Sequence, residues 1–370
     1  MLSFKDFYEM CSDGNLEEVL PLEKVKPVWI FGAGNFAQDV CSAITKEGFN
    51  FQGFIVSDPE QSKILEFPVV GLNNFPVEER DVQLVFGVFN RNTPFDDLKG
   101  IIQQQGFNNI FMPWHIYPQF ESHLGWRYWL SGKNAITNEL DQIEQVYELL
   151  DDDTSKQCLL NICLFRLGMN DNYASFIHDE DQYFNNITLE AASDKPLSYV
   201  DMGAYNGDTV IELSKKANLA SAYLFEPDSG NFNDLVKAVS KLNIKSTCIP
   251  LGIADNYKIL SFSSDGGEGS LISEEGNLHI AVAPLDDILI NQSIDFIKMD
   301  IEGAELLALA GAKKSIEKNR PILAISYYHK PDDIWKIPLW LSEHCDNYKF
   351  YLRQHHYNSF DSVLYAVPVY

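Results

Sequence analysis

One stretch of the sequence decides the fold: Tyr199-Val-Asp201-Met-Gly203-Ala-Tyr-Asn-Gly207-Asp208-Thr209. It predicts a strand that ends in an acid, a tight turn at the first glycine, and a second glycine ahead of a helix. The N–H groups at the start of such a helix favour negative charge. We therefore expect these N–H groups to bind a carboxylate and Asp201 to bind an ammonium group. The alternative is a plain strand–helix turn capped by Asp208 or Thr209.

A second acid follows at the end of the next predicted strand, in Leu224-Phe225-Glu226-Pro227-Asp228. An acid about 20 residues after a glycine turn is placed to accept hydrogen bonds from both hydroxyls of a ribose. Glu226 as an ordinary exposed strand-end carboxylate is the alternative. The two motifs together favour a cofactor of the adenosine type.

The third signal is Phe296-Ile-Lys298-Met-Asp300-Ile-Glu302-Gly303-Ala-Glu305. Lys298 and Asp300 lie on one face of a strand by its two-residue period, so we expect the two to pair. Gly303 allows a sharp turn into the next helix. This turn would place Asp300 and Glu302 in the crevice beyond the carboxyl ends of the strands, where doubly wound sheets bind ligands.

Seven strands are predicted from Leu197 onward, and helices separate the first several of them. The last two strands are joined by a short loop, so they should pair antiparallel. The predicted strands are Ser198–Met202, Ala222–Phe225, Thr247–Leu251, Ile294–Met299, Pro321–Ser326, Lys349–Arg353 and Ser362–Val367. We assign residues 197–370 to this second α/β domain.

The first 120 residues predict a smaller Rossmann-like α/β domain, because strands and helices alternate with short loops. Its first strand, Pro27–Phe31, leads into Gly32-Ala-Gly34-Asn-Phe-Ala37 and a helix, as a dinucleotide fingerprint does. Asp58 lies near the place of a ribose partner. This turn either binds a nucleotide-linked substrate or is a degenerate scaffold, and we favour a scaffold or weak binding.

Residues 121–196 predict a helical connector. Its first helix carries a stripe of apolar residues from Leu140 to Leu150, and Asp151-Asp152-Asp153 interrupts the stripe. We interpret this triplet as a solvated helix junction rather than a binding site. Ser155 is the expected cap of the second helix, which should stop at Gly168.

Composition excludes several classes of partner. Lys+Arg number 28 and Asp+Glu 53, which gives a net charge of −25. A surface this negative should repel nucleic-acid phosphates and anionic lipid, so we expect neither as a partner. No apolar run approaches the roughly 18 residues that span a bilayer, and the start has no signal-peptide layout. The oligomeric state, including a homo-oligomer, is left open.

The six cysteines are scattered along the chain. They include no Cys-x-x-Cys, and no cysteine–histidine pair has the spacing of a zinc site. We therefore expect reduced thiols of a cytoplasmic protein and no metal ligands. Whether the reaction requires a metal is not readable from the sequence.

The motifs YVDMGAYNGDT, LFEPD, LGIADN, PLDDIL, FIKMDIEGAELLALAGA and ISYYHKPDDIW, in this order and spacing, resemble the FkbM-type S-adenosylmethionine-dependent methyltransferases. The resemblance covers roughly Ser198 to the C-terminus, and KMDIEGAE is its most specific part. The segment Asp181-Gln-Tyr-Phe184 in the connector also looks like members with this longer layout.

The resemblance implies the doubly wound seven-stranded sheet of class I methyltransferases, S-adenosylmethionine as cofactor, and usually O-methylation of sugar or natural-product hydroxyls. The acceptor would be a small molecule or a glycan. Ala254 and Asp255 would lie near the adenine of the cofactor. The other implied cofactor positions are Asp201, Gly203, Ala204, Gly207, Thr209, Glu226 and Pro227.

Methyl transfer from a sulfonium to oxygen is an in-line displacement, so positioning should supply most of the rate gain. A base near the acceptor hydroxyl would add about 10²–10⁴-fold. His329 follows the fifth strand, which should lie beside the strand that carries Asp300. We predict His329 as the base, with Asp300 and Glu302 orienting it or sharing that role. The alternative for His329 is a helix-entry residue.

Two further readings stay open. The glycine-serine stretch at residues 263–270 is either a lid over the acceptor or an ordinary loop. The function itself has two alternatives: a nicotinamide-dependent oxidoreductase that uses the N-terminal glycine turn, and a non-catalytic nucleotide-binding scaffold.

Overall fold

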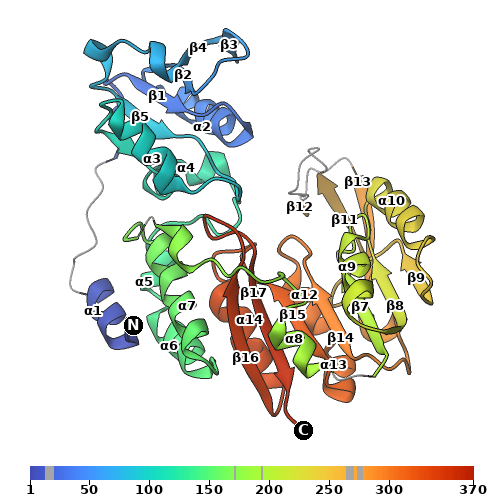
Figure 1. Ribbon diagram of the computed structural model, residues 1–370. Coiled ribbons are helices and arrows are strands. Elements are labelled where there is room, and N and C mark those ends of the chain that lie inside the picture. Colours follow the sequence, from blue (N-terminus) through green and yellow to red (C-terminus); the bar gives the residue numbers. More distant parts are fainter. Residues whose placement is uncertain (13–20, 171, 193–194, 264–270, 273–277) are drawn as a thin grey trace. The chain divides into compact units, whose positions relative to one another are not determined.

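The computed structural model describes residues 1–12, 21–170, 172–192, 195–263, 271–272 and 278–370 (Figure 1). The chain divides into two compact units. Unit 1 consists of Met1–Asp141, Gln157–Ile177 and His356–Phe360, and unit 2 of Gln142–Lys156, His178–His355 and Asp361–Tyr370. The residues that we assigned to a connector, 121–196, are therefore distributed over both units.

Unit 1 contains a six-stranded sheet in the order β3-β4-β2-β1-β5-β6. All its pairings are parallel except that of β3 with β4. Strands β3 and β4, which form the outer hairpin, were not predicted from the sequence. The strands are β1 Val28–Phe31, β2 Phe51–Val56, β3 Lys63–Ile64, β4 Phe67–Gly71, β5 Gln83–Phe86 and β6 Ile110–Phe111.

The helices of unit 1 follow the alternation predicted from the sequence. Helix α2, Asn35–Lys46, begins directly after the glycine turn, and α3 is Phe95–Gln104. The core of the unit is rich in aromatic rings, which explains where much of the Phe content lies. The remaining helices are α1 Phe4–Ser12, α4 Pro113–Leu124 and α5 Asn134–Thr137, with short 3₁₀ turns at Leu72–Asn74, Val77–Glu79 and Tyr173–Phe176.

Helices α6, Leu140–Leu149, and α7, Asp153–Arg166, confirm the two predicted helices, but their junction corrects two expectations. The cap of α7 is Asp152, whose Oδ1 accepts the Ser155 N–H at 2.7 Å. The junction is also not simply solvated, because Asp152 pairs with Arg353 at 2.7 Å. Ser155 is buried, and its Oγ accepts a hydrogen bond from the Leu352 N–H instead.

Unit 2 contains a seven-stranded sheet in the order β16-β17-β15-β14-β7-β8-β9. It includes all seven predicted strands, and the final hairpin is antiparallel as expected. Continuous apolar runs form the central strands because both faces of a parallel sheet are covered. The strands are β7 Leu197–Met202, β8 Leu219–Phe225, β9 Ser246–Ile249, β14 Phe296–Met299, β15 Ile322–Ser326, β16 Tyr348–Gln354 and β17 Ser362–Pro368.

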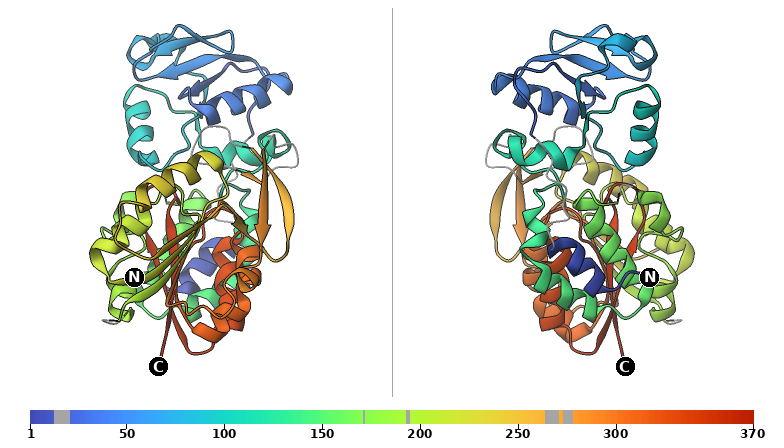
Figure 2. Two further views of the ribbon diagram at one scale, coloured as in Figure 1. Left: turned by 90° about the vertical axis from the view of Figure 1, so that its right-hand side faces the viewer. Right: turned by 90° about the vertical axis from the view of Figure 1, so that its left-hand side faces the viewer.

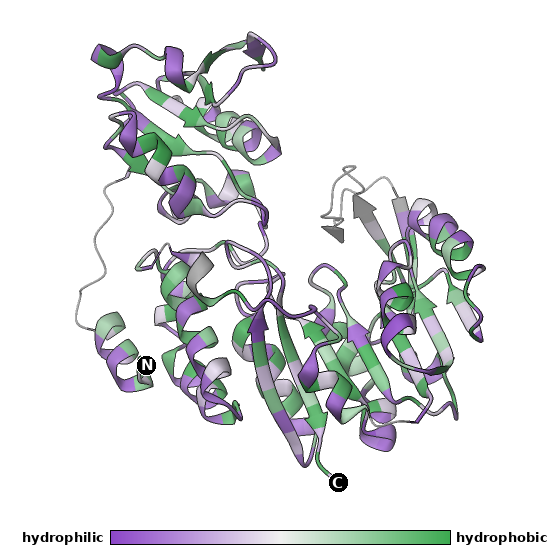
Figure 3. Cartoon of the chain, viewed as in Figure 1, coloured by the Kyte–Doolittle hydropathy of each residue, from purple (hydrophilic) through white to green (hydrophobic). Residues whose placement is uncertain are grey.

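Helices cover both faces of this sheet. Helices α9, Asp208–Lys216, and α10, Ser229–Val239, lie on one face (Figure 2). The opposite face carries α12 Glu305–Gly311, α13 Lys313–Asn319 and α14 Asp333–His344. Two shorter helices, α8 Asn186–Ala191 and α11 Leu285–Ile288, also belong to the unit. The strands are mainly hydrophobic, whereas the helices present both hydrophobic and hydrophilic residues (Figure 3).

A second, four-stranded sheet in unit 2 was not expected. Its order is β10-β13-β11-β12. The strands are β10 Gly252–Ile253, β11 Lys258–Ser263, β12 Leu271–Ile272 and β13 Leu278–Ala283. Residues 264–270 of the glycine-serine stretch, for which a lid and an ordinary loop were the alternatives, lie outside the described part of the chain. Across the residues that are described, no helix combines the length and the apolar character that crossing a membrane would require.

Candidate functional site

The turn between β7 and α9 has the geometry that its two glycines predict. Gly203 has φ +85°, and a Cβ there would lie 2.0 Å from the carbonyl oxygen of Asp300. Gly207, with φ +88°, is the residue that precedes the first turn of α9. Only glycine fits at position 203, because a left-handed conformation and a backbone contact coincide there.

Asp201 lies inside the protein and not at the surface of the turn. Its side chain is fully buried, Oδ1 is 3.1 Å from Nζ of Lys298, and Oδ2 accepts the Tyr199 hydroxyl at 3.0 Å. Burial raises the pKa of Asp201 to about 6, although the Lys298 charge acts in the opposite direction. The expected pair of Lys298 with Asp300 is corrected: the ion pair of Lys298 is with Asp201, its partner in the β7–β14 register.

Lys298 links this buried pair to the turn. Its Nζ also donates a hydrogen bond of 2.6 Å to the carbonyl oxygen of Gly203. Asp201 and Lys298 therefore hold the backbone of the turn in place. In this arrangement the carboxylate of Asp201 is engaged by protein groups, so an ammonium group of a ligand would have to compete with Lys298.

Glu226 lies at the end of β8, beside the turn. Its carboxylate accepts the Tyr205 N–H and the Asp228 N–H, each at 2.9 Å. Burial raises the pKa of Glu226 to about 7, against the effect of these two N–H groups. Backbone hydrogen bonds from Gly203 and Ala204 to the Phe225 carbonyl fix β8 against the turn.

The remaining predicted cofactor residues surround this point. Thr209 lies in the first turn of α9, where its N–H donates a hydrogen bond to Oδ1 of Asp208. Pro227 directly follows Glu226. A Cβ on Gly252 would lie 3.9 Å from the Pro227 ring, which places strand β10 next to the same strand end. Ala254 is buried directly after β10. Asp255 is exposed and pairs with Lys258 at 3.1 Å.

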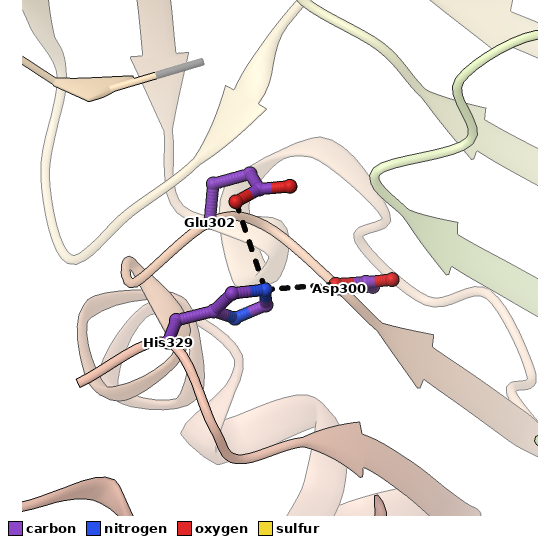
Figure 4. A group of neighbouring side chains, drawn as sticks. All are labelled: Asp300, Glu302 and His329. Carbon is purple, nitrogen blue, oxygen red and sulfur yellow. Dashed lines mark ion pairs between the residues drawn. The ribbon is translucent and has the colours of Figure 1, made fainter. Parts of the chain in front are cut away.

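Asp300, Glu302 and His329 converge as predicted, from the ends of the adjacent strands β14 and β15 (Figure 4). Nε2 of His329 lies 3.3 Å from Oδ1 of Asp300 and 3.7 Å from Oε2 of Glu302. The imidazole is fully buried, whereas the side chains of Asp300 and Glu302 are 26% and 28% exposed. The two carboxylates are therefore the parts of this cluster that an incoming molecule can touch.

The charges in the cluster shift one another's ionisation. Burial alone would lower the pKa of His329, but the carboxylates of Glu305 and Glu302 outweigh it and hold that pKa well above its usual value. Burial raises the pKa of Glu302 to about 8. The pKa of Asp300 lies below its ordinary range because the imidazole of His329 and the charge of Lys298 outweigh burial.

Two residues of the site were missed in the sequence analysis. Glu305 is fully buried and contacts Nδ1 of His329 at 2.8 Å. Tyr183 donates its hydroxyl hydrogen to Oδ2 of Asp300 at 2.8 Å. Glu305 stands within the segment quoted above, and Tyr183 within the Asp181–Phe184 resemblance, so both signals were present without a role attached.

The N-terminal glycine turn forms as expected in unit 1. Gly32 has φ +105°, and Gly34 precedes α2 with extended backbone. A Cβ on Gly34 would meet no atom within 4 Å. Asp58 follows β2 and is exposed.

Comparison with known proteins agrees with this fold. Residues 201–359 match the profile of the methyltransferase FkbM domain. The structure of a methyltransferase FkbM from Methylobacillus flagellatus superposes with a TM-score of 0.77 at 20% identity, and the match covers 98% of this chain and 99% of that chain. A search of curated proteins found no significant match.

A second solved structure, a putative methyltransferase from Streptococcus mutans in complex with SAH, matches with a TM-score of 0.32 at 17% identity, over 49% of this chain and 94% of that one. The superposition on the Methylobacillus flagellatus structure covers nearly the whole chain. It confirms the predicted fold class, a class I methyltransferase sheet with a smaller N-terminal Rossmann-like part. Residues 201–359 of the chain therefore form a methyltransferase FkbM domain.

Proposed function

We propose that the protein is an S-adenosylmethionine-dependent O-methyltransferase that acts on a hydroxyl group of a carbohydrate or a related small molecule. The observation that carries this proposal is the contact between the glycine turn and the acidic cluster. The Asp300 N–H donates to the Met202 carbonyl at 3.0 Å, and Gly203 packs on the Asp300 carbonyl oxygen. A methyl donor bound at the turn and a hydroxyl compound bound at the acidic cluster would thus be neighbours.

The residues beside the turn suit an adenosine-type cofactor. A carboxylate has about four acceptor positions, and Glu226 uses two of them on backbone N–H groups, so the others remain for ribose hydroxyls. A ligand carboxylate at the start of α9 would have to displace Oδ1 of Asp208, which accepts the Thr209 N–H at 2.7 Å. Ala254 and Asp255 would border the adenine. When bound, S-adenosylmethionine supplies a methyl group that is activated by its sulfonium sulfur.

The acidic cluster suits a hydroxyl acceptor, which must lose its proton as the methyl group is transferred. Asp300 and Glu302 are partly exposed, so we propose that they face the acceptor. His329 was expected to be the base. Because its imidazole is fully buried, we propose instead that His329 acts through the two carboxylates by holding their orientation and charge.

The class of acceptor rests on the sequence resemblance. A net charge of −25 supports a small molecule or glycan over a nucleic acid. Six cysteines without disulfide bonds support the cytoplasm as its location.

Calorimetry on the full chain with S-adenosylhomocysteine and with NADH tests the cofactor assignment. We expect saturable binding of S-adenosylhomocysteine only. An acceptor screen with a radiolabelled methyl donor then tests the reaction. Binding of NADH in place of S-adenosylhomocysteine would overturn the proposal in favour of an oxidoreductase, and cofactor binding without label transfer to any hydroxyl compound would favour a scaffold.

A further inference from the structure

We infer that Asp300, Glu302 and His329 form a binding site for one divalent metal ion, with Mn²⁺ as the best match. Each side chain offers one ligand atom, and the three atoms all lie within 4.8 Å of one another. The spacing of residues along the chain predicts no metal ligands. Here the ligands come from two segments that only the parallel pairing of β14 and β15 brings together.

The separations fit an ion at the centre of the cluster. Two ligand atoms bound at about 2.1 Å lie about 3.0 Å apart at right angles and about 3.4 Å apart in a tetrahedron. Nε2 of His329 lies 3.3 Å from Asp300 Oδ1 and 3.7 Å from Glu302 Oε2. Shifts of a few tenths of an ångström would bring all three atoms to bonding distance. Figure 4 shows these atoms pointing toward one another.

The imidazole is also held in the way that metal ligation requires. A histidine that binds a metal through one nitrogen usually donates the other N–H to a carboxylate, which fixes the tautomer and the ring orientation. Nδ1 of His329 contacts Glu305 Oε1 at 2.8 Å, and the same oxygen accepts the Ile301 N–H at 3.1 Å. Glu305 thus orients the ring so that Nε2 points at Asp300 and Glu302.

The carboxylate oxygens that face the ring of His329 are those that can still accept a bond. Oδ2 of Asp300 accepts the Tyr183 hydroxyl, whereas Oδ1 faces the ring. Within the described part of the chain, Asp300 Oδ1 and Glu302 Oε2 are buried and accept no hydrogen bond. Buried carboxylate oxygens are normally paired or coordinate metals. The carboxylates of Asp300, Glu302 and Glu305 surround the imidazole of His329. A doubly charged cation would balance their negative charges.

The donor set narrows the choice of metal. Two carboxylate oxygens with one imidazole nitrogen suit Mn²⁺, because Mg²⁺ prefers oxygen alone and softer ions prefer thiolates or several imidazoles. Three protein ligands leave coordination positions open. If the proposed function holds, on which this step rests, the acceptor hydroxyl would occupy one of these positions. The ion would lower the pKa of that hydroxyl, and its proton would pass to solvent water as the methyl group is transferred.

Titration of the full chain with MnCl₂, followed by the electron paramagnetic resonance signal of free Mn²⁺, tests the site. We expect one saturable site per chain. Glu302→Gln should lower the affinity of this site for Mn²⁺ at least about tenfold. Glu317→Gln is the matched control, because Glu317 is an exposed glutamate of unit 2 that pairs with Lys313 on the surface. Circular dichroism should show that both variants are folded.

Two outcomes would overturn the inference: no saturable binding by the unmodified protein at about millimolar Mn²⁺, a weak limit for a carboxylate site, or equal affinity in Glu302→Gln and Glu317→Gln. If Glu302→Gln does not fold, Asp300→Asn takes its place in the same comparison. Calorimetry with S-adenosylhomocysteine on the same samples separates this inference from the proposed function. Mn²⁺ binding without cofactor binding would refute the function alone, and the converse would refute the metal site alone.

Discussion

The two glycine turns of this protein share a backbone design and differ in the side chains around it. In unit 1 the Gly32 N–H donates to Ile55, and the Gly87 N–H after β5 donates to Phe31. In unit 2 the same two hydrogen bonds run from Gly203 to Phe225 and from Asp300 to Met202. Both units thus place a strand–glycine–helix turn between two neighbouring parallel strands.

The strands β5 and β14, which border the two turns, are followed by different side chains. In unit 1 the chain continues after β5 as Gly87-Val88-Phe89, and the ring of Phe89 packs at 5.1 Å on that of Phe36. In unit 2 the corresponding positions are Asp300 and its successors, and Glu226 is buried beside the turn. A glycine turn therefore indicates a fold, whereas acids on the neighbouring strand ends indicate a ligand site.

The largest expected effect separates the two turns at their glycines. Gly203→Ala should destabilise the protein by more than about 4 kcal/mol, because a Cβ would lie 2.0 Å from the Asp300 carbonyl oxygen at φ +85°. Gly34→Ala should change stability by less than about 1 kcal/mol, since its Cβ meets nothing within 4 Å. Urea unfolding of both variants measures the difference. Equal effects would show that the two turns are under the same constraint.

The buried pair beneath the second turn is the next test. Asp201→Ala should destabilise by about 3–5 kcal/mol, because it leaves the buried Lys298 ammonium uncompensated. The double variant Asp201→Ala with Lys298→Met should recover much of this loss, since an apolar replacement of a buried pair is often neutral. A double-mutant cycle from urea unfolding gives the coupling. Additive losses would mean that the two side chains do not act as a pair.

Cofactor affinity should depend on pH through Glu226. Its pKa is raised from 4.5 to about 7, so the folded protein binds more protons than the unfolded chain between these values, and stability falls as pH rises through that range. Ribose hydroxyls donate hydrogen bonds to the ionised carboxylate, so the affinity for S-adenosylhomocysteine should increase as pH rises. We expect it to rise about tenfold from about pH 6 to about pH 8.

Calorimetry at several pH values measures this dependence. Glu226→Gln, which keeps the size of the side chain but does not titrate, should bind more weakly with a flat profile. A slope that persists in Glu226→Gln would assign the titration to another group and remove Glu226 from the ribose site.

The elements that could be predicted are those specified by local pattern. The seven strands of the main sheet are apolar runs bounded by turn residues, and the convergence of Asp300 with His329 follows from the carboxyl ends of adjacent parallel strands. The four-stranded sheet was missed because two of its strands, Gly252–Ile253 and Leu271–Ile272, are only two residues long.

Within the site, the missed contacts depend on register and on turn geometry. Lys298 pairs with Asp201 because the β7–β14 register places them opposite each other, which no spacing within one segment reveals. Glu305 reaches His329 through a turn in which Glu302 and Gly303 both have positive φ. Tyr183 comes from a loop more than a hundred residues away in sequence, so its contact with Asp300 is a property of the tertiary fold.

The smallest expected effect belongs to the exposed member of two similar histidine–glutamate contacts, one in each unit. His123 and His329 each lie 2.8 Å from a glutamate oxygen, of Glu47 and Glu305 respectively, but the first pair is partly exposed and the second fully buried. His123→Gln should leave Tm unchanged within error, because water and salt screen an exposed ion pair. Glu305→Gln should keep most of the hydrogen bond to His329 and yet weaken Mn²⁺ binding about 10–100-fold, since the charge behind a metal-binding imidazole raises its basicity. Thermal melts and the Mn²⁺ titration check the two halves of this prediction. A clear loss of Tm in His123→Gln, or unchanged Mn²⁺ affinity in Glu305→Gln, would mean that burial is not what separates the two histidines.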